Sequence, residues 1–177
     1  IESWDKQEHL GDELNRMKHF FSYSKTKKCF KKDGLCDVCV EKLGDVSIQV
    51  CKLNSAPFST RKPDDKQFHF FPAEIREKLE RRPNVDLKIT IMHHHFEWCE
   101  WDTKEMIKEA IKSDDMTFFG HDHKAESYTT QFSNGQRNTI FMGGKFELAP
   151  GKAADFSAFV FDSEQHSVLK YQFDWSI

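Results

Sequence analysis

Two clusters of histidine each follow a short apolar segment of this chain. Lys-Ile-Thr-Ile-Met precedes His93, His94 and His95, and Met-Thr-Phe-Phe-Gly precedes His121 and His123. Together they are the majority of the 9 histidines in the protein. Neutral imidazole is a suitable ligand for zinc, iron and manganese. If both apolar segments are strands of one α/β sheet, the clusters lie at the edge where such sheets build their sites. The pattern therefore predicts metal ligation.

The elements that must position these histidines are two strands with a helix between them. Leu87–Met92 and Met116–Phe119 have the length and apolar composition of short strands. Between them, Asp102 followed by Glu105 predicts the capped start of a helix. We therefore expect both histidine clusters at one edge of the same sheet.

The histidines of the second cluster are separated by a single residue. In an extended segment His121 and His123 share one face, whereas at a bend after the strand they reach two ions side by side. Gly120 permits a bend or a close backbone approach at this point. Two ions about 3.5–4 Å apart polarise a phosphoryl oxygen and hold a hydroxide near neutral pH.

The rest of the chain predicts a mixed α/β fold. Apolar residues at helical spacing cover residues 4–23, and a further helix opens at Phe71-Pro72, where proline suits the first turn. Beyond the second cluster the period changes to two, and Asn134-Gly135 is a strong hairpin signal. The predicted fold class is α/β, a mixed-sheet sandwich flanked by helices. The remaining predicted strands are Val46–Leu53, Ser127–Phe132, Arg137–Met142, Phe156–Asp162 and Val168–Phe173.

Length and composition limit the class of protein. A chain of 177 residues predicts a single domain, and 38% hydrophobic residues allow a sizeable core. The formal net charge of -3 gives no global attraction to nucleic acid or to an anionic membrane. No apolar run approaches the roughly 18 residues of a membrane span. Because the sequence starts at Ile1 without a leader, we expect a processed product or part of a longer protein.

The cysteines favour a reducing compartment. Their number, 5, forms no even framework, and we expect a cytoplasmic protein. Cys36 and Cys39 form a CxxC pair, with Cys29 preceding it. We interpret them as cysteines of a loop or helix start, with a small zinc knuckle or redox pair as the alternative. The lysine-rich stretch Lys25–Lys32 is either a solvated loop or a patch that meets phosphates.

These motifs resemble those of the calcineurin-like metallophosphoesterases. Ile-Met-His-His-His-Phe-Glu-Trp followed by Phe-Phe-Gly-His-Asp-His is similar to that family's strand-end histidine, often His-His-Pro, and its Gly-His-x-His. Leu53-Asn54-Ser55 resembles the Leu-Asn-Ser that often ends the preceding strand. The resemblance covers most of the chain from about Val46 onwards. It implies an αββα sandwich and a metal-dependent phosphohydrolase, acting on phosphodiesters or phosphomonoesters.

The resemblance also implies roles for individual residues. His93 and His121 match ligands of the second metal, and His123 matches a ligand of the first. The cofactors would be two divalent ions, such as manganese, iron or zinc, with a metal-bound hydroxide attacking phosphorus in line. His95 stands where the family usually has proline, so His94 and His95 are candidate contacts of the substrate phosphate, or loop residues. A site histidine would act as general acid.

Some motifs of the family have no counterpart in this chain. No Asp-x-His follows an apolar strand, and no Gly-Asn-His occurs. We therefore expect the C-terminal portion of a metallophosphoesterase domain, whose N-terminal portion carries the Asp and Asn ligands on the same or a separate chain. The expected partners are this portion and a phosphoester substrate, with nucleic acid among the candidate substrates.

Two alternatives to a phosphohydrolase are open at this stage. One is a catalytically inactive binding or scaffold module of the same fold, with the aromatic loop Phe96–Trp101 and the lysine-rich loop as partner surfaces. Within that loop, Trp98 either shapes the mouth of the site or packs in the interior. The other alternative is a nucleic-acid-binding domain built on a cysteine zinc site at Cys29, Cys36 and Cys39, together with the lysine-rich stretch.

Overall fold

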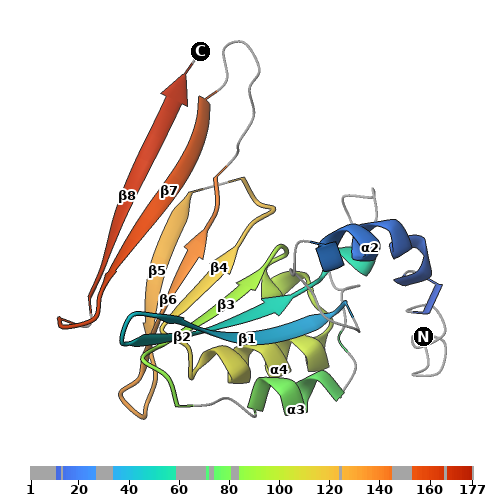
Figure 1. The fold of residues 1–177 in the computed structure, drawn as a ribbon, viewed down its shortest axis with the longest axis horizontal. Coiled ribbons are helices and arrows are strands. Elements are labelled where there is room, and N and C mark those ends of the chain that lie inside the picture. Colours follow the sequence, from blue (N-terminus) through green and yellow to red (C-terminus); the bar gives the residue numbers. More distant parts are fainter. Residues whose placement is uncertain are drawn as a thin grey trace.

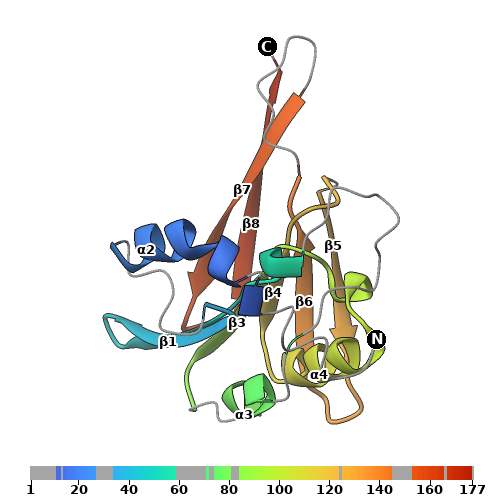
Figure 2. The same ribbon diagram turned by 90° about the vertical axis from the view of Figure 1, so that its right-hand side faces the viewer.

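The computed structural model describes residues 11–12, 14–26, 34–58, 71, 74–80, 84–123, 125–144, 153–165 and 167–176. Within these residues the fold is mixed α/β, with helices α3 and α4 on one face of a six-stranded sheet and a two-stranded ribbon on the other (Figures 1 and 2). The helical elements are α2 (Lys18–Thr26), η1 (Ala56–Phe58), α3 (Glu74–Glu80), η2 (Phe96–Trp98) and α4 (Trp101–Ile111). The strands are β1 (Cys36–Leu43), β2 (Val46–Leu53), β3 (Leu87–Met92), β4 (Met116–Phe119), β5 (Glu126–Gln131), β6 (Arg137–Met142), β7 (Ala153–Asp162) and β8 (Ser167–Ser176).

The sheet has four parallel central strands that end level with one another. The strand order is β1-β2-β3-β4-β6-β5, with β1 antiparallel to β2 and β5 antiparallel to β6. The last residues of the central strands are aligned, because Leu53 pairs with Met92, Met92 with Phe119, and Phe119 with Met142. The segments that follow these strands therefore start side by side at one edge of the sheet.

The central strands pack against other elements on both faces of the sheet. Met92 and Phe119 pack with Ile107 and Ile111 of α4 on the helix side. On the opposite side Leu87, Met116 and Phe141 pack against Phe159, Phe161 and Val168 of the ribbon. Strands covered on both faces appear in a sequence as short apolar runs, which is why β3 and β4 were predictable. The mixed α/β class is confirmed.

Several predicted boundaries are confirmed. β2, β3, β4 and β6 begin and end at the predicted residues, and β5 pairs with β6 around the predicted Asn-Gly turn, where Gly135 has φ +85°. The second predicted hairpin is also present as β7 and β8, but both strands are longer than predicted. The helix predicted for residues 4–23 differs: residues 14–16 are helical, a turn falls at Met17, and α2 continues to Thr26. Residues 4–10 and Pro72 lie outside the described residues.

The predicted cap of α4 is wrong. The N-cap residue is Glu100, which makes no side-chain capping hydrogen bond, and the helix begins at Trp101. Asp102 is therefore inside the first turn, where a carboxylate still interacts favourably with the positive end of the helix dipole.

The interpretation of Cys36–Cys39 as a loop or helix start is also wrong. Both residues belong to β1, which forms a hairpin with β2 through a turn at Gly44, where φ is +63°. Successive side chains of a strand alternate between its faces, so residues three apart point to opposite sides. Cys36 is in the helix-side core, and Cys39 contacts the Val50 carbonyl oxygen through its thiol. The two thiols of this pair therefore cannot bind one zinc ion, while Cys29 lies outside the described residues.

The ribbon formed by β7 and β8 pairs with no other strand in the described part of the chain. Its outward side is apolar and about half exposed, and Phe156 stacks on Phe173 across the two strands with ring centroids 4.8 Å apart. The other exposed large apolar residues of the ribbon are Val160, Leu169 and Tyr171.

The described residues contain no helix with the length and apolar character needed to cross a membrane.

Candidate metal centre

The carboxyl edge of the central strands places the two histidine clusters together. His93 directly follows β3, and Gly120 directly follows β4. The Gly120 N–H donates a hydrogen bond to the His93 carbonyl oxygen across 2.9 Å, which extends the pairing of the two strands by one step. A Cβ atom at Gly120 would lie 3.0 Å from Nδ1 of His93, so the glycine allows the imidazole to lie close against the backbone.

Three imidazoles converge at this edge. His93, His94 and His121 each offer a ring nitrogen, and these nitrogens lie within 4.8 Å of one another. Nδ1 of His121 is 3.4 Å from Nε2 of His93. Because a zinc–imidazole bond is about 2.0–2.1 Å, two ligands of a tetrahedral ion are about 3.4 Å apart. The three residues therefore fit a single metal ion with small movements of the rings.

The backbone after β4 turns His121 and His123 in different directions. His121 has φ +69° and His123 has φ +56°, and they are the non-glycine residues with positive φ in the described part of the chain. This conformation costs about 1–2 kcal/mol per residue, and such strain is typical of functional sites. The bend directs His121 to His93, whereas His123 is exposed and lies outside the group of three. The structure thus brings together two of the three predicted ligands, with His94 in the third place.

The pKa of the His93 imidazole is lowered, which favours its neutral form. Burial lowers the pKa of the His93 imidazole, and the nearby His121 and His123 lower it further because their positive charges would repel an imidazolium. A neutral ring has a lone pair for a metal, whereas a protonated ring has none.

His94 is held by a residue from the end of β2. The Oγ atom of Ser55 lies 2.8 Å from Nδ1 of His94, and the His94 backbone N–H donates to the same oxygen across 3.2 Å. Ser55 is 1% exposed and His94 is 4% exposed. In the neighbouring position, Asn54 donates its side-chain amide to the Gly34 carbonyl oxygen and accepts the Ala56 N–H. Asn54 therefore shapes the turn, while Ser55 contacts the site.

His95 occupies a different environment from its two neighbours. Its Nδ1 accepts the Glu97 N–H as the N-cap of η2, and Nε2 lies 3.4 Å from the Tyr128 hydroxyl. The ring is 9% exposed and packs against Phe96 and Phe119. Burial lowers the pKa of His95. Through these contacts His95 stabilises the loop that follows it, and it is not one of the three converging imidazoles. That His94 and His95 contact a substrate phosphate stays a prediction.

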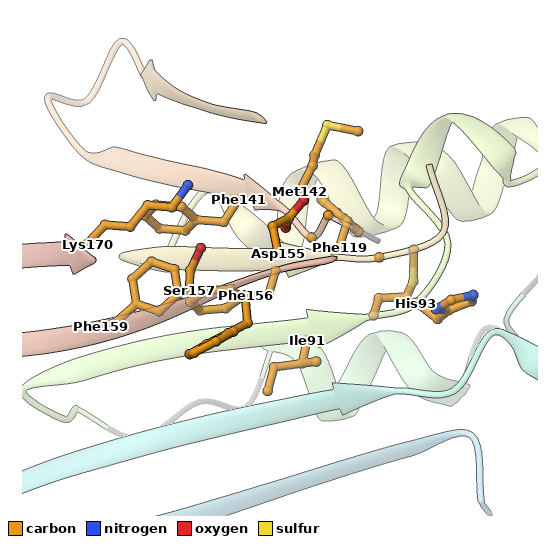
Figure 3. A pocket seen from close by; sticks show the side chains of 15 residues that line it. Ile91, His93, Phe119, Phe141, Met142, Asp155, Phe156, Ser157, Phe159 and Lys170 are labelled. Carbon is orange, nitrogen blue, oxygen red and sulfur yellow. The ribbon is translucent and has the colours of Figure 1, made fainter. Parts of the chain in front are cut away.

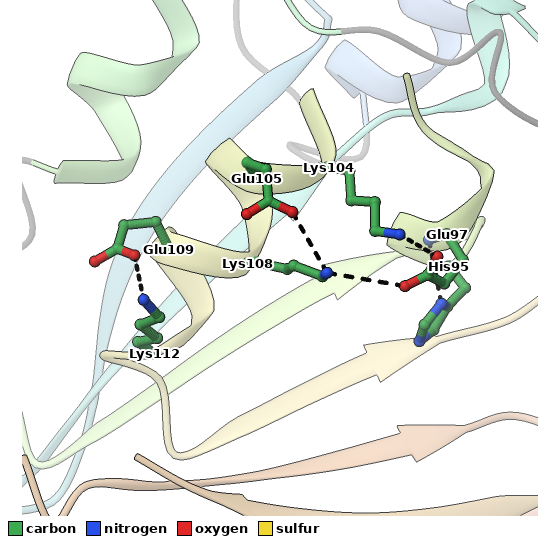
Figure 4. Close-up of polar contacts among 7 residues, drawn as sticks. All are labelled: His95, Glu97, Lys104, Glu105, Lys108, Glu109 and Lys112. Atoms are coloured by element: carbon green, nitrogen blue, oxygen red, sulfur yellow. Dashed lines mark hydrogen bonds and ion pairs between the residues drawn. The ribbon is translucent and has the colours of Figure 1, made fainter. Parts of the chain in front are cut away.

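The aromatic loop after His95 forms one wall of the site. The Trp98 ring lies edge-on to His121, with centroids 4.7 Å apart and planes at 81°. The loop is tied to α4 because Glu97 forms ion pairs with Lys104 and Lys108 (Figure 4). These contacts show Trp98 packed beside the site histidines His94 and His121.

Two hollows lie between the sheet and the ribbon. The first has a volume of about 450 Å³ and is bordered by His93 at one end (Figure 3). Its walls are mostly apolar, and its polar side chains besides His93 are Asp155, Ser157 and Lys170. The second, about 420 Å³, is lined only by apolar residues such as Leu43 and Phe161. The histidine site therefore adjoins a largely apolar space.

Comparison with known proteins gives coarse similarities. No protein-family model matches the sequence, and no curated protein is a significant match. A phosphatase of Mycoplasma pneumoniae has 15% identity and a TM-score of 0.45, over 78% of this chain and 56% of that structure. A hypothetical protein of Thermus thermophilus has 13% identity and a TM-score of 0.46, over 77% and 61%. A 5'-nucleotidase of Candida albicans has 13% identity and a TM-score of 0.41, over 77% and 26%.

This chain thus spans less than two thirds of each of these solved structures. Similarities of this size do not assign it to a family. The residues of the site carry the functional proposal.

Proposed function

We propose that this chain provides the histidine ligands of a metal-dependent phosphohydrolase. The observation that carries the proposal is the convergence of His93, His94 and His121 at the carboxyl edge of β3 and β4, with ring nitrogens within 4.8 Å. Support also comes from the order of the motifs, a strand-end histidine run followed by Gly-His-Asp-His, which resembles the calcineurin-like metallophosphoesterases. When bound, divalent cations polarise a phosphoryl oxygen and lower the pKa of a water molecule.

The residues of this chain have separate tasks in the proposal. The three grouped imidazoles bind one cation, and the strained backbone at His121 holds that ring towards His93. His123, which is exposed, is the proposed contact for a second cation. Trp98 packs edge-on against His121 and forms one side of the site.

We further infer that this chain is the C-terminal portion of a larger phosphoesterase domain. In the described part of the chain the group of three contains no carboxylate, although hard divalent cations in hydrolytic sites usually need one. In this proposal the remaining ligands come from an N-terminal portion, on the same or a separate chain.

The proposal is tested on the intact protein by metal analysis together with hydrolysis of bis(nitrophenyl) phosphate and nitrophenyl phosphate. We expect bound divalent metal, hydrolysis that a chelator abolishes, and a loss of at least about 100-fold in His121→Ala, since this variant removes a direct ligand. Metal binding without hydrolysis would favour the alternative of an inactive binding module. The absence of metal binding, with His121→Ala equal to wild type, would refute the proposal.

A further inference from the structure

We propose that Ser55 is a positioning residue that selects which nitrogen of His94 binds the metal. The inference rests on the proposed metal site and concerns a residue outside the group of three imidazoles. Ser55 lies at the carboxyl end of β2, the strand beside β3, and is 39 residues from His94 in sequence. Both side chains are buried, so water does not compete strongly for their hydrogen bonds.

The hydrogen bonds of the Ser55 hydroxyl leave two arrangements. A hydroxyl group has one hydrogen and two lone pairs. One lone pair accepts the His94 backbone N–H across 3.2 Å, which leaves one lone pair and the hydrogen for Nδ1 at 2.8 Å. Either the hydroxyl donates to an unprotonated Nδ1, or a protonated Nδ1 donates to the hydroxyl oxygen.

Metal binding distinguishes these arrangements. A metal ion on Nε2 requires the proton of a neutral imidazole to be on Nδ1, because a protonated nitrogen has no lone pair to give. Ser55 provides the buried acceptor for that proton. Ligand histidines usually have such a partner, which fixes the tautomer and the ring orientation, and its loss typically lowers metal affinity about 10–100-fold. The two bonds to one oxygen also hold the His94 ring relative to its own backbone.

The experiment is a zinc titration of the intact protein, followed by calorimetry and by 15N spectra of the histidine rings. In wild type we expect zinc to convert His94 to the tautomer with hydrogen on Nδ1, with the metal on Nε2. Ser55→Ala should bind zinc about 10–100-fold more weakly, and Ser55→Thr, which keeps a hydroxyl, should restore most of the affinity. Ser113→Ala is the matched control, because it removes a serine hydrogen bond to the Ala110 carbonyl oxygen away from the site.

The outcomes separate this inference from the proposed function. If wild type does not bind zinc, the proposed metal site is wrong and the inference falls with it. If wild type binds zinc while Ser55→Ala binds equally well, only the role of Ser55 is wrong. Should Ser55→Ala fail to fold, the wild-type spectra decide alone: zinc on Nδ1 of His94, or a His94 ring unaffected by zinc, would overturn the inference.

Discussion

Gly120 lies directly against the imidazole of His93 and donates its backbone N–H to the carbonyl oxygen of the same residue. This contact joins the ends of β3 and β4 and sets the distance between the two histidine clusters. The site is therefore sensitive to side-chain volume at a position that has no ligand atom of its own.

The first prediction concerns this contact. Gly120→Ala places a methyl group 3.0 Å from Nδ1 of His93, so the ring must move by a few tenths of an ångström. We expect roughly a 10-fold loss of metal affinity by calorimetry, with a small change in thermal stability. Gly143→Ala is the control, because its nearest contact, the Phe119 carbonyl oxygen, would be at 3.5 Å, an ordinary distance. Equal effects in both variants would contradict the prediction.

The second prediction separates the two histidines of Gly-His-Asp-His. His121→Ala should abolish high-affinity binding of the first cation and the associated rise in the melting temperature, because a ligand that binds only the folded state stabilises it. His123→Ala should retain binding of the first cation, since His123 lies outside the group of three. Thermal melts with and without manganese or zinc measure this difference. The reverse ranking of the two variants would show that the assignment is wrong.

The third prediction is a loss of stability in mild acid. Burial lowers the pKa of His95, and burial with His121 and His123 lowers that of His93, so the unfolded chain binds more protons below the ordinary value of about 6.5. The stabilising contribution of these two histidines to the free energy of unfolding is therefore fully present above about pH 6.5. It decreases as the pH falls below this value. Urea melts between pH 7.5 and 5 should show this decrease, and His95→Gln should flatten it. A stability that rises on acidification would contradict the assignment.

The fourth prediction compares two buried threonines on neighbouring strands. Thr90 is 0% exposed, and its hydroxyl has no hydrogen-bond partner among the described residues, whereas the Thr117 hydroxyl accepts the Asn138 amide at 2.9 Å. Thr90→Val should be neutral or stabilising by up to about 1 kcal/mol, because an unpaired buried hydroxyl is replaced by a methyl group. Thr117→Val should destabilise by about 1–2 kcal/mol. Denaturant melts of the two variants test the difference in sign.

Much of the central sheet was predictable, because β3 and β4 are short apolar sequences with clear ends and β2 alternates between apolar and polar residues. The histidine clusters were predictable for the same reason, since they start where these strands stop. β1 was not, because its outer half contains Glu41 and Lys42 and only its first residues are buried.

Within the site, the missed features depend on backbone angles and on distant contacts. The place of His94 in the group of three was not predicted, and the positive φ angles that leave His123 outside this group cannot be inferred from spacing. The bond between Ser55 and His94 joins two separate strand ends, and only the parallel pairing of β2 with β3 brings them together. The sequence did contain a signal, because Ser55 follows the last residue of β2 by two positions, as His94 follows β3.

The unpaired edges of the β7–β8 ribbon affect how this protein is expected to behave at high concentration. Both of its outer strand borders present rows of backbone N–H and C=O groups that pair with no other strand in the described part of the chain. Unpaired strand edges of this kind can form hydrogen bonds with a strand of another molecule. The apolar outward side of the ribbon would add hydrophobic contacts to such an association. We therefore expect concentrated preparations of this chain to self-associate, and lysine introduced along these borders to reduce the effect.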